Sequence, residues 1–194
     1  MHYIVGLGNP GEEYAQTRHN AGEMILRFFI EDAGLPALHD SSAHSGAWSE
    51  GTLHGSDVAC LFPHTFMNHS GAAVAKMVPA EAISRLLVIY DDVDLPIGTM
   101  KASFDRGAGG HNGIRSIAES LGSQAFARLR IGVAKRQLLT GRAQRPSAAA
   151  LADYVLGAFT KKELEALGEM RARTYEAICS FIDEGPERMM NRFN

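Results

Sequence analysis

The chain has 194 residues, of which 45% are hydrophobic and 21% charged, and its formal net charge is −3. This composition is typical of one globular domain that can bury a core without disulfides or a structural metal. The only two cysteines, Cys60 and Cys179, exclude a disulfide framework and are expected to be buried thiols in a reducing cytoplasm. No basic segment opens the chain and no stretch approaches the roughly 18 to 20 apolar residues of a membrane span, so we expect a cytoplasmic protein without a membrane partner. The small acidic excess also disfavours a protein coated in positive charge for binding nucleic acid.

Strand and helix patterns alternate along the chain, without repeats or a linker that would divide it. Apolar runs predict buried strands, apolar residues at helical spacing predict amphipathic helices, and a polar segment broken by glycine and proline, 135–146, predicts a surface loop. The expected elements are, in order, a strand over 3–7, a helix over 22–33, strands over 46–53 and 58–62 joined by a hairpin turn at 54–57, a helix over 70–78, strands over 86–90 and 97–104, a helix over 112–121, a strand over 129–133, and helices over 148–156 and 161–182. We therefore predict a single α/β domain, residues 1–194, with a twisted mixed sheet flanked by helices.

The first loop resembles a dinucleotide-binding site. Gly6, Gly8 and Gly11 match G-x-G-x-x-G after a strand, and Glu31 and Asp32 follow about 20 residues later. However, the loop continues into two glutamates rather than a helix N-terminus that could face a pyrophosphate, and the two later acidic residues end a helical pattern instead of a strand. The sequence therefore favours a glycine turn over an NAD or FAD site, and we expect no cofactor.

Polar residues with catalytic potential gather in short loops beside glycines, where strands are expected to end. In open α/β sheets, loops of this kind converge on a crevice at the carboxyl ends of the strands. A histidine and an aspartate suggest a general base and the group that orients it. Asparagines provide both a donor and an acceptor, so they can bind a peptide or a developing oxyanion without adding charge. The five residues are Asn9, His19, Asn68, Asp91 and Asn112.

Each of these residues also has an ordinary structural explanation. A lone asparagine is more often a turn or cap residue, a lone histidine is more often a surface or core residue, and Asp91 can cap the turn that follows it. Metal binding is poorly supported because the eight histidines form no H-E-x-x-H motif and the cysteines form no C-x-x-C pair. No G-x-S-x-G motif supports a serine hydrolase either.

Taken together, the motifs resemble those of bacterial peptidyl-tRNA hydrolases, in the same order and over nearly the whole chain. The matching segments are Val5-Gly6-Leu7-Gly8-Asn9-Pro10-Gly11, Tyr14, Thr17-Arg18-His19-Asn20, Thr65-Phe66-Met67-Asn68, Asp91 with Asp94-Leu95-Pro96, Gly109-Gly110-His111-Asn112-Gly113, Arg128-Leu129-Arg130-Ile131-Gly132 and Asp153-Tyr154-Val155-Leu156.

The resemblance implies hydrolysis of the ester between a peptide and the 3′-terminal adenosine of tRNA, with no metal and no cofactor. His19 would be the general base that activates water, and Asp91 the acid that supports it. Asn9 would contact the scissile end of the peptide and favour blocked over free aminoacyl groups, while Asn68 and Asn112 would bind substrate and help to place the water. Tyr14 and Phe66 would line the site for the substrate end, where an aromatic face can pack on a base or ribose. Asp92 and Asp94 are interpreted as turn or surface carboxylates.

Residues 101–145 form a basic segment, with nine Lys or Arg against two Asp or Glu, a net charge of +7 that leaves −10 for the rest of the chain. We expect this segment to bind phosphates, with Lys101 and Arg130 matching family positions near the tRNA. The family often has another basic residue where this chain has Ser103, and Arg106 is a candidate to compensate.

Two other classes stay open at this point. A domain that binds tRNA or another RNA without cleaving it would share the basic segment, and activity on peptidyl-tRNA would distinguish it. A nucleotide-dependent oxidoreductase would show quenching of Trp48 by NAD(P)H, which we do not expect. For the hydrolase, we expect peptidyl-tRNA as the partner and a monomeric chain.

Overall fold

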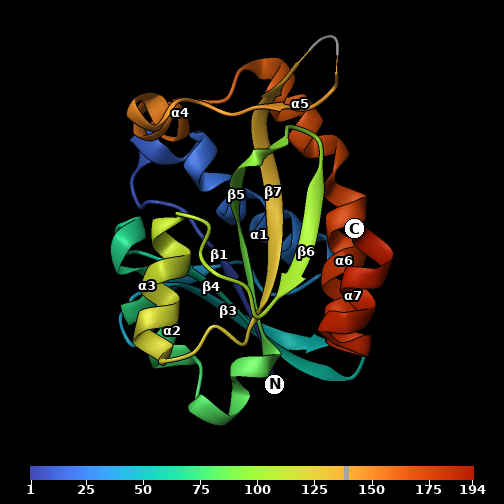
Figure 1. Cartoon of the computed structure of the whole chain (residues 1–194). Coiled ribbons are helices and arrows are strands. Elements are labelled where there is room, and N and C mark those ends of the chain that lie inside the picture. The colour runs from blue at the N-terminus through green and yellow to red at the C-terminus, as the bar shows by residue number, and fades with distance from the viewer. Residues whose placement is uncertain (138–139) are drawn as a thin grey trace.

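The computed structural model describes residues 1–137 and 140–194 and places one sheet at the centre of the molecule (Figure 1). Its strands are β1 (His2–Gly6), β2 (His39–Ser41), β3 (Gly46–Leu53), β4 (Ser56–Pro63), β5 (Leu86–Pro96), β6 (Met100–Phe104), β7 (Ala127–Arg136) and β8 (Ala143–Gln144). The α-helices are α1 (Ala21–Asp32), α2 (Ser70–Met77), α3 (Asn112–Leu121), α4 (Leu151–Leu156), α5 (Lys161–Glu169), α6 (Arg171–Glu184) and α7 (Pro186–Phe193). Short 3₁₀ segments are η1 (Glu12–Tyr14), η2 (Arg18–Asn20), η3 (Met67–His69), η4 (Ala80–Arg85) and η5 (Ala148–Ala150).

The sheet is mixed, in the order β2-β3-β4-β1-β5-β7-β6, with β8 paired to β7. The four central strands β4, β1, β5 and β7 are parallel to one another. The remaining pairs, β2 with β3, β3 with β4, and both β6 and β8 with β7, are antiparallel. Because the helices pack around this one sheet, the predicted α/β domain with a mixed sheet flanked by helices is confirmed.

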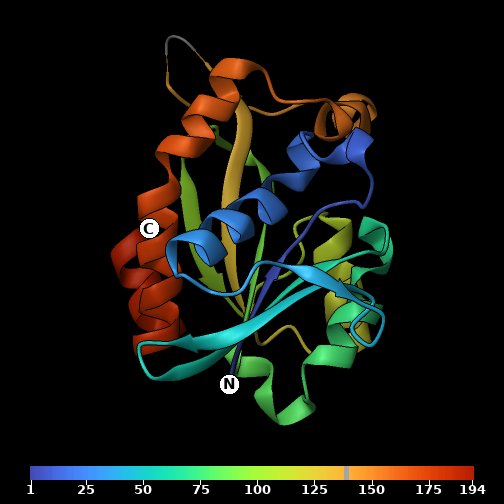
Figure 2. The same ribbon diagram turned by 180° about the vertical axis from the view of Figure 1, so that it is seen from behind.

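Both faces of the sheet are covered by helices (Figures 1 and 2). Alternate residues of each central strand point to opposite faces, so that Ile4 and Ile89 join the core under α1, α6 and α7 while Val5 and Val88 join the core under α2 and α3. This double burial explains why these strands are nearly continuous apolar runs in the sequence.

Two glycines bring α1 close to the end of β1. A Cβ on Gly6 would lie 2.6 Å from the carbonyl oxygen of Gly22, and a Cβ on Gly22 would lie 2.8 Å from the backbone nitrogen of Leu7. No residue with a side chain fits at these two contacts, so the two glycines are required for the packing of α1 against β1.

The chain after Gly11 enters the single turn η1 and α1 begins only at Ala21, so no helix N-terminus follows the glycine loop as a dinucleotide site requires.

Several element boundaries differ from the expected ones. The strand predicted over 86–90 continues to Pro96 because its partner β7 continues beside it, and the register shifts between Asp92 and Pro96. Asp91 therefore lies inside β5 instead of after it. The strand predicted over 97–104 begins only at Met100, after a turn in which Gly98 has φ +78°. The hairpin turn is two residues, His54 and Gly55, both with positive φ, as a tight hairpin requires.

The C-terminal half differs in three places. The helix predicted over 161–182 is divided at Met170 into α5 and α6, and α7 follows from Gly185 with Pro186 in its first turn. The predicted loop over 135–146 instead contains the end of β7 and the strand β8, although its residues 138–139 lie outside the described part of the chain.

Both cysteines are buried and unpaired, as expected. Across residues 1–137 and 140–194, no helix has the length and apolar composition needed to cross a membrane.

Candidate active site

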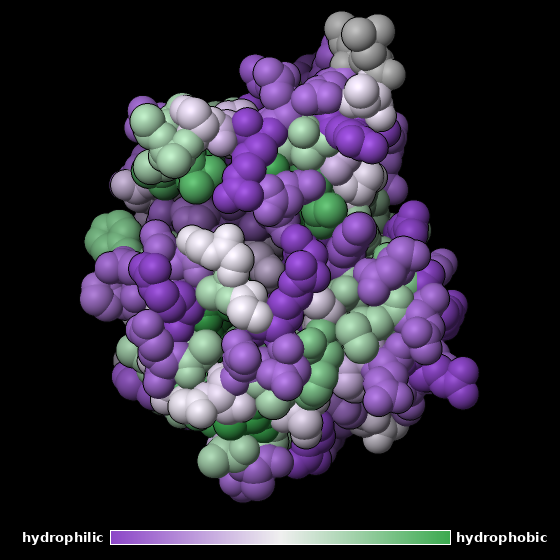
Figure 3. All heavy atoms as spheres, in the orientation of Figure 1, coloured by the Kyte–Doolittle hydropathy of each residue, from purple (hydrophilic) through white to green (hydrophobic). Residues whose placement is uncertain are grey.

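A cleft of about 790 Å³ opens where β1 ends and β5 and β7 continue. Gly6 is the last residue of β1 to pair with β5, opposite Ile89, so among the described residues no strand pairs with β5 on that side from Asp91 onward. The loops after β1, β4 and β6 converge on this point, and α4 closes it from the other side. In Figure 3, hydrophilic side chains surround the middle of this face and hydrophobic side chains lie above them at α4. The predicted site residues that line the cleft are Asn9, Tyr14, His19, Phe66, Asn68, Asp91, Asn112 and Arg130.

His19 and Asp91 are hydrogen-bonded inside the cleft. The distance from His19 Nδ1 to Asp91 Oδ1 is 2.7 Å, and the side chains are 12% and 2% exposed. Burial alone would raise the pKa of Asp91, but the charges and hydrogen bonds of His19 and His111 outweigh it and hold that pKa well below its usual range. The carboxylate is thus ionised and accepts a hydrogen bond from the Nδ1–H group, which leaves Nε2 of a neutral His19 as the free base.

Burial by itself would lower the pKa of His19, since it disfavours the imidazolium. The charge of Asp91 and the hydrogen bond to it together outweigh burial, and the net effect is a pKa above the ordinary value of 6.5. His19 therefore accepts a proton more readily than a free imidazole does.

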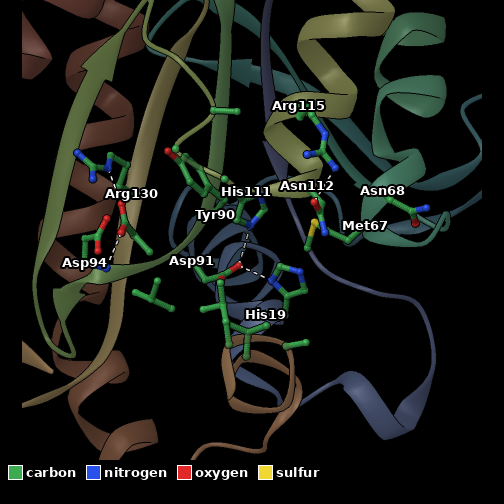
Figure 4. A pocket seen from close by; sticks show the side chains of 18 of the residues that line it. His19, Met67, Asn68, Tyr90, Asp91, Asp94, His111, Asn112, Arg115 and Arg130 are labelled. Carbon is green, nitrogen blue, oxygen red and sulfur yellow. Dashed lines mark hydrogen bonds and ion pairs between the residues drawn. The ribbon is translucent and has the colours of Figure 1, made fainter. Parts of the chain in front are cut away.

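A second histidine, His111, contacts the same carboxylate and was not singled out from the sequence. Its Nε2 lies 3.0 Å from Asp91 Oδ1, and its Nδ1 accepts a hydrogen bond from the backbone N–H of Ile114 at 3.3 Å, which caps α3. Because Nδ1 is an acceptor, a neutral His111 carries its proton on Nε2, and this N–H group donates a hydrogen bond to Asp91. Figure 4 shows the two rings approaching Asp91 from different sides. A histidine at a helix N-cap position after a glycine loop is the only sequence signal for this role.

The three groups His19, Asp91 and His111 are also the only cluster in the described residues with ligand atoms close enough together, within 4.8 Å, to hold a metal ion. Both rings direct a nitrogen at the same carboxylate oxygen, at hydrogen-bonding distances. A cation at this point would have to replace both of these protons.

The orientation of the Asn9 amide is determined by its neighbours. Its Oδ1 accepts from the backbone N–H of Met67 at 2.8 Å, so its Nδ2 is left as a donor at the cleft wall. Asn20 holds the Asn9 backbone from both sides, accepting from its N–H and donating to its carbonyl oxygen, each at 2.9 Å. Asn20 thus fixes the backbone of a cleft residue, a contact that could not be predicted from the sequence.

The other predicted substrate residues line the rim of the cleft. Asn68 is exposed within η3, and Phe66, directly before η3, is 58% exposed, an unusual position for a phenylalanine. Tyr14 lies half-buried in η1. Asn112 is exposed at the start of α3, where its Oδ1 accepts from Arg115 Nη2 at 2.8 Å.

The basic segment is partly neutralised in the fold. Arg130 Nε lies 2.5 Å from Asp92 Oδ2, with both side chains mostly buried, and Arg145 lies 2.8 Å from Asp94. The interpretation of Asp92 as a turn or surface carboxylate is therefore wrong, because its position inside β5 buries it beside Arg130. Arg128 is fully buried and donates to the Gly107 carbonyl at 3.0 Å, so it cannot contact phosphate.

The remaining positions of interest on β6 and after it differ in exposure. Lys101 on β6 is exposed and pairs in register with Arg130 on β7, although it does not line the cleft itself. Ser103 is buried and its hydroxyl has no hydrogen-bond partner among the described residues. Arg106 is exposed and lines the cleft.

The chain is similar to known proteins over nearly its whole length. The family model described as peptidyl-tRNA hydrolase matches residues 3–194. A peptidyl-tRNA hydrolase from Chloroflexus aggregans is 42% identical over 100% of this chain and 99% of its own, and one from a Geobacter species (strain M21) is 39% identical over 98% and 96%. The crystal structure of peptidyl-tRNA hydrolase from Acinetobacter baumannii superposes with a TM-score of 0.87 at 31% identity, over 100% of this chain and 94% of that one. Because the family model and these relatives span the chain from end to end, we conclude that it belongs to the peptidyl-tRNA hydrolase family.

Proposed function

We propose that this protein hydrolyses the ester bond between a peptide, or an N-blocked aminoacyl group, and the 3′-terminal adenosine of a tRNA, recycling tRNA from peptidyl-tRNA released prematurely. The observation that carries the proposal is the 2.7 Å contact between His19 and an ionised Asp91 in a cleft lined by amide side chains. Membership of the family supports the substrate class.

In the proposed reaction, Nε2 of His19 removes a proton from water while the water oxygen attacks the ester carbonyl carbon. Asp91 stabilises the imidazolium that results. Asn9 lines the cleft, and its Nδ2 donor stabilises the oxyanion of the tetrahedral intermediate. When the intermediate collapses, the ester bond breaks, the ribose oxygen takes the proton from His19, and the peptide leaves as a carboxylic acid.

Substrate contacts are assigned to the rim. Asn68 and Asn112 bind substrate and help to place the water, and Tyr14 and Phe66 offer aromatic faces to a base or ribose at the tRNA end. Their common location on the cleft wall supports these roles.

Phosphate binding is assigned to Lys101 and Arg130. Their register across β6 and β7 places the two cations on the same face of the sheet. Since Arg130 is paired with Asp92, this carboxylate competes with a phosphate for the cation when tRNA binds.

We further propose that the protein works as a cytoplasmic monomer, consistent with two buried, unpaired thiols. Sedimentation equilibrium at micromolar concentration would show one chain per particle, and a stable dimer would contradict the proposal.

The test is single-turnover hydrolysis of N-acetylaminoacyl-tRNA by wild type, His19→Ala and a matched control, His39→Ala. His39 is exposed on the edge strand β2, away from the cleft. We expect His19→Ala to lower the rate by about 10² to 10⁴ and His39→Ala to leave it unchanged. The same assay with a chelator tests whether a metal ion is needed, and we expect the chelator to leave the hydrolysis rate of the wild type unchanged.

Other outcomes separate the alternatives. A folded His19→Ala variant as fast as wild type would refute the general base. A wild type that binds the tRNA without cleaving it would favour a non-catalytic RNA-binding domain. A loss of activity with chelator that added metal restores would assign a cation to the cluster of His19, Asp91 and His111.

A further inference from the structure

The residue before the base, Arg18, is buried and extends away from the cleft. It is 7% exposed and lies with His19 in η2. Its backbone N–H donates to the carbonyl oxygen of Gly157 at 3.1 Å, and Thr17 bridges to Ala158. The segment that carries His19 is therefore bound along its backbone to the chain that leaves α4.

The side chain of Arg18 joins the same two regions. Nη1 donates to the carbonyl oxygens of Tyr154 and Gly157 at 3.4 and 3.1 Å, which are acceptors at the C-terminal end of α4. Nη2 lies 3.1 and 2.9 Å from the two carboxylate oxygens of Glu163, in the first turn of α5. The guanidinium carbon lies 4.6 Å from the centre of the Tyr154 ring. One side chain thus connects η2, α4 and α5.

Glu163 is ionised in this contact. Burial would raise its pKa, but hydrogen bonds from the Thr160 backbone, Arg18 and the Thr160 hydroxyl, together with the charge of Arg18, lower it below the usual value. With side chains only 8% and 11% exposed, the pair is shielded from solvent. A guanidinium can contact a carboxylate and two carbonyls at once because its donors form a rigid fork, which an ammonium cannot reproduce.

The helix held by Arg18 forms one wall of the cleft, through Leu151, Ala152, Val155 and Leu156. The His19 ring faces two other groups, Asp91 on β5 and His111 directly before α3. A change in how η2 sits on α4 would therefore change both the distance from His19 to Asp91 and the distance from His19 to this wall.

We propose that Arg18 is a positioning residue for the hydrolysis, which sets the placement of His19 against Asp91 and the α4 wall through its contacts with Glu163 and the end of α4. This inference rests on the proposed function, because it concerns the general base of that reaction.

The test compares Glu163→Gln and Arg18→Lys with Thr160→Ala. Glu163→Gln keeps the shape of the side chain and removes the charge that Arg18 faces. Thr160→Ala is the matched control, since it removes the cap hydroxyl of α5, which donates to Glu163 at 2.9 Å, and leaves Arg18 and Glu163 in place. The readouts are kcat and KM on N-acetylaminoacyl-tRNA, and the ¹⁵N and ¹H signals of the His19 ring across a pH titration of the free protein.

We expect Glu163→Gln and Arg18→Lys to lower kcat by about tenfold, with a smaller change in KM, and to move the His19 ring signals and titration midpoint toward those of a free imidazole. Thr160→Ala should lower thermal stability, change kcat by less than about twofold and leave the His19 signals at their wild-type positions. The ring signals do not depend on turnover, so they test the positioning role even if the wild type fails to hydrolyse the substrate.

Folded Glu163→Gln and Arg18→Lys variants with wild-type kcat and wild-type His19 signals would overturn the proposal. It would also be overturned if Thr160→Ala changed kcat and the His19 signals as much as Glu163→Gln does, because the effect would then be general destabilisation. If one of the two variants does not fold, the other decides.

Discussion

Among single residues, Asp91 has the strongest effect on His19, the proposed general base, because it is hydrogen-bonded to the ring and raises its pKa. One carboxylate oxygen accepts from Nδ1 of His19 and Nε2 of His111, so the tautomers of both rings follow from one buried charge. Such a carboxylate orients the base and stabilises its protonated form. The same charge raises the pKa of His19, which gives the reaction a predictable dependence on pH.

Because only neutral His19 accepts a proton from water, kcat/KM should fall as pH decreases through a pKa above 6.5 in the wild type. Asp91→Asn removes the charge that raises this pKa, so the acid limb should move to lower pH, while the plateau falls on the order of 10²-fold. Both effects are measured in a pH profile of kcat/KM on a blocked aminoacyl-tRNA. An unchanged profile would remove Asp91 from the mechanism.

Asn9 offers a substitution that separates its two hydrogen-bonding atoms. Asn9→Asp keeps an oxygen to accept from the Met67 N–H and replaces the Nδ2 donor with a negatively charged oxygen. We expect kcat to fall by about 10² to 10³ with the fold retained, as when one oxyanion donor is removed. Parallel assays on blocked and free aminoacyl-tRNA test whether Asn9 also favours blocked over free aminoacyl groups. A variant that discriminates between them as well as wild type would contradict a part for Asn9 in that choice.

At the scale of elements, the cleft depends on the close contact of α1 with β1 and β5. A Cβ on Gly22 would overlap the carbonyl oxygen of Ile89, two residues before Asp91. We expect Gly22→Ala to lower the free energy of unfolding by about 1 to 3 kcal/mol, because backbone cannot move as a flexible side chain does.

The control for this prediction is Gly168→Ala in α5, where a Cβ meets nothing within 4 Å. This change should raise stability by up to about 1 kcal/mol, since alanine favours the helical conformation more than glycine does. Urea unfolding of both variants measures the difference. Equal effects of the two substitutions would show that the α1 contact is not tightly packed.

Element boundaries show what the sequence could and could not predict. The apolar run over 86–90 predicts a strand, but the continuation of β5 to Pro96 could not be predicted, because polar residues such as Asp91 and Asp92 normally mark the end of a buried strand. They remain in the strand because each has a partner from another part of the chain, His19 for Asp91 and Arg130 for Asp92. The strand β2 consists of three polar residues, 39–41, whose types give no strand signal, and it forms only because β3 provides an edge to pair with.

For the molecule as a whole, the distribution of charge bears on the proposed binding of RNA. The excess of +7 over residues 101–145 is reduced in space by Asp92 and Asp94, which lie outside that segment but pair with arginines inside it. Arg128 is also withdrawn into the core. RNA affinity should therefore come from a few local contacts.

With two phosphate contacts, from Lys101 and Arg130, tRNA affinity should fall about tenfold between 50 and 200 mM salt, far less than for a protein making six or more. Asp92→Asn frees Arg130 from its partner and should tighten binding several-fold. Asp57→Asn makes the same change in net charge on the distant β3–β4 hairpin and should have little effect. Fluorescence anisotropy with labelled tRNA measures the affinity of the wild type and of both variants. Equal increases in affinity from the two substitutions would show that only net charge matters.

Strand and helix periodicity and short motifs are local properties of a chain, so the fold class, the family resemblance and the residue types at the site could all be predicted from the amino-acid sequence. Polar side chains beside glycines at strand ends converge in an α/β sheet, so five residues that line the cleft could also be predicted, although His111 was missed: Asn9, His19, Asn68, Asp91 and Asn112. Which atoms come into contact at the site depends on the folded structure. His19 and Asp91 are 72 residues apart and Asn9 and Met67 are 58 apart, so the tautomer of His19, the orientation of the Asn9 amide and the second contact from His111 depend on the packing of distant segments. The pairing of Arg130 with Asp92 arose in the same way, from two neighbouring strands that the linear order of residues does not place side by side.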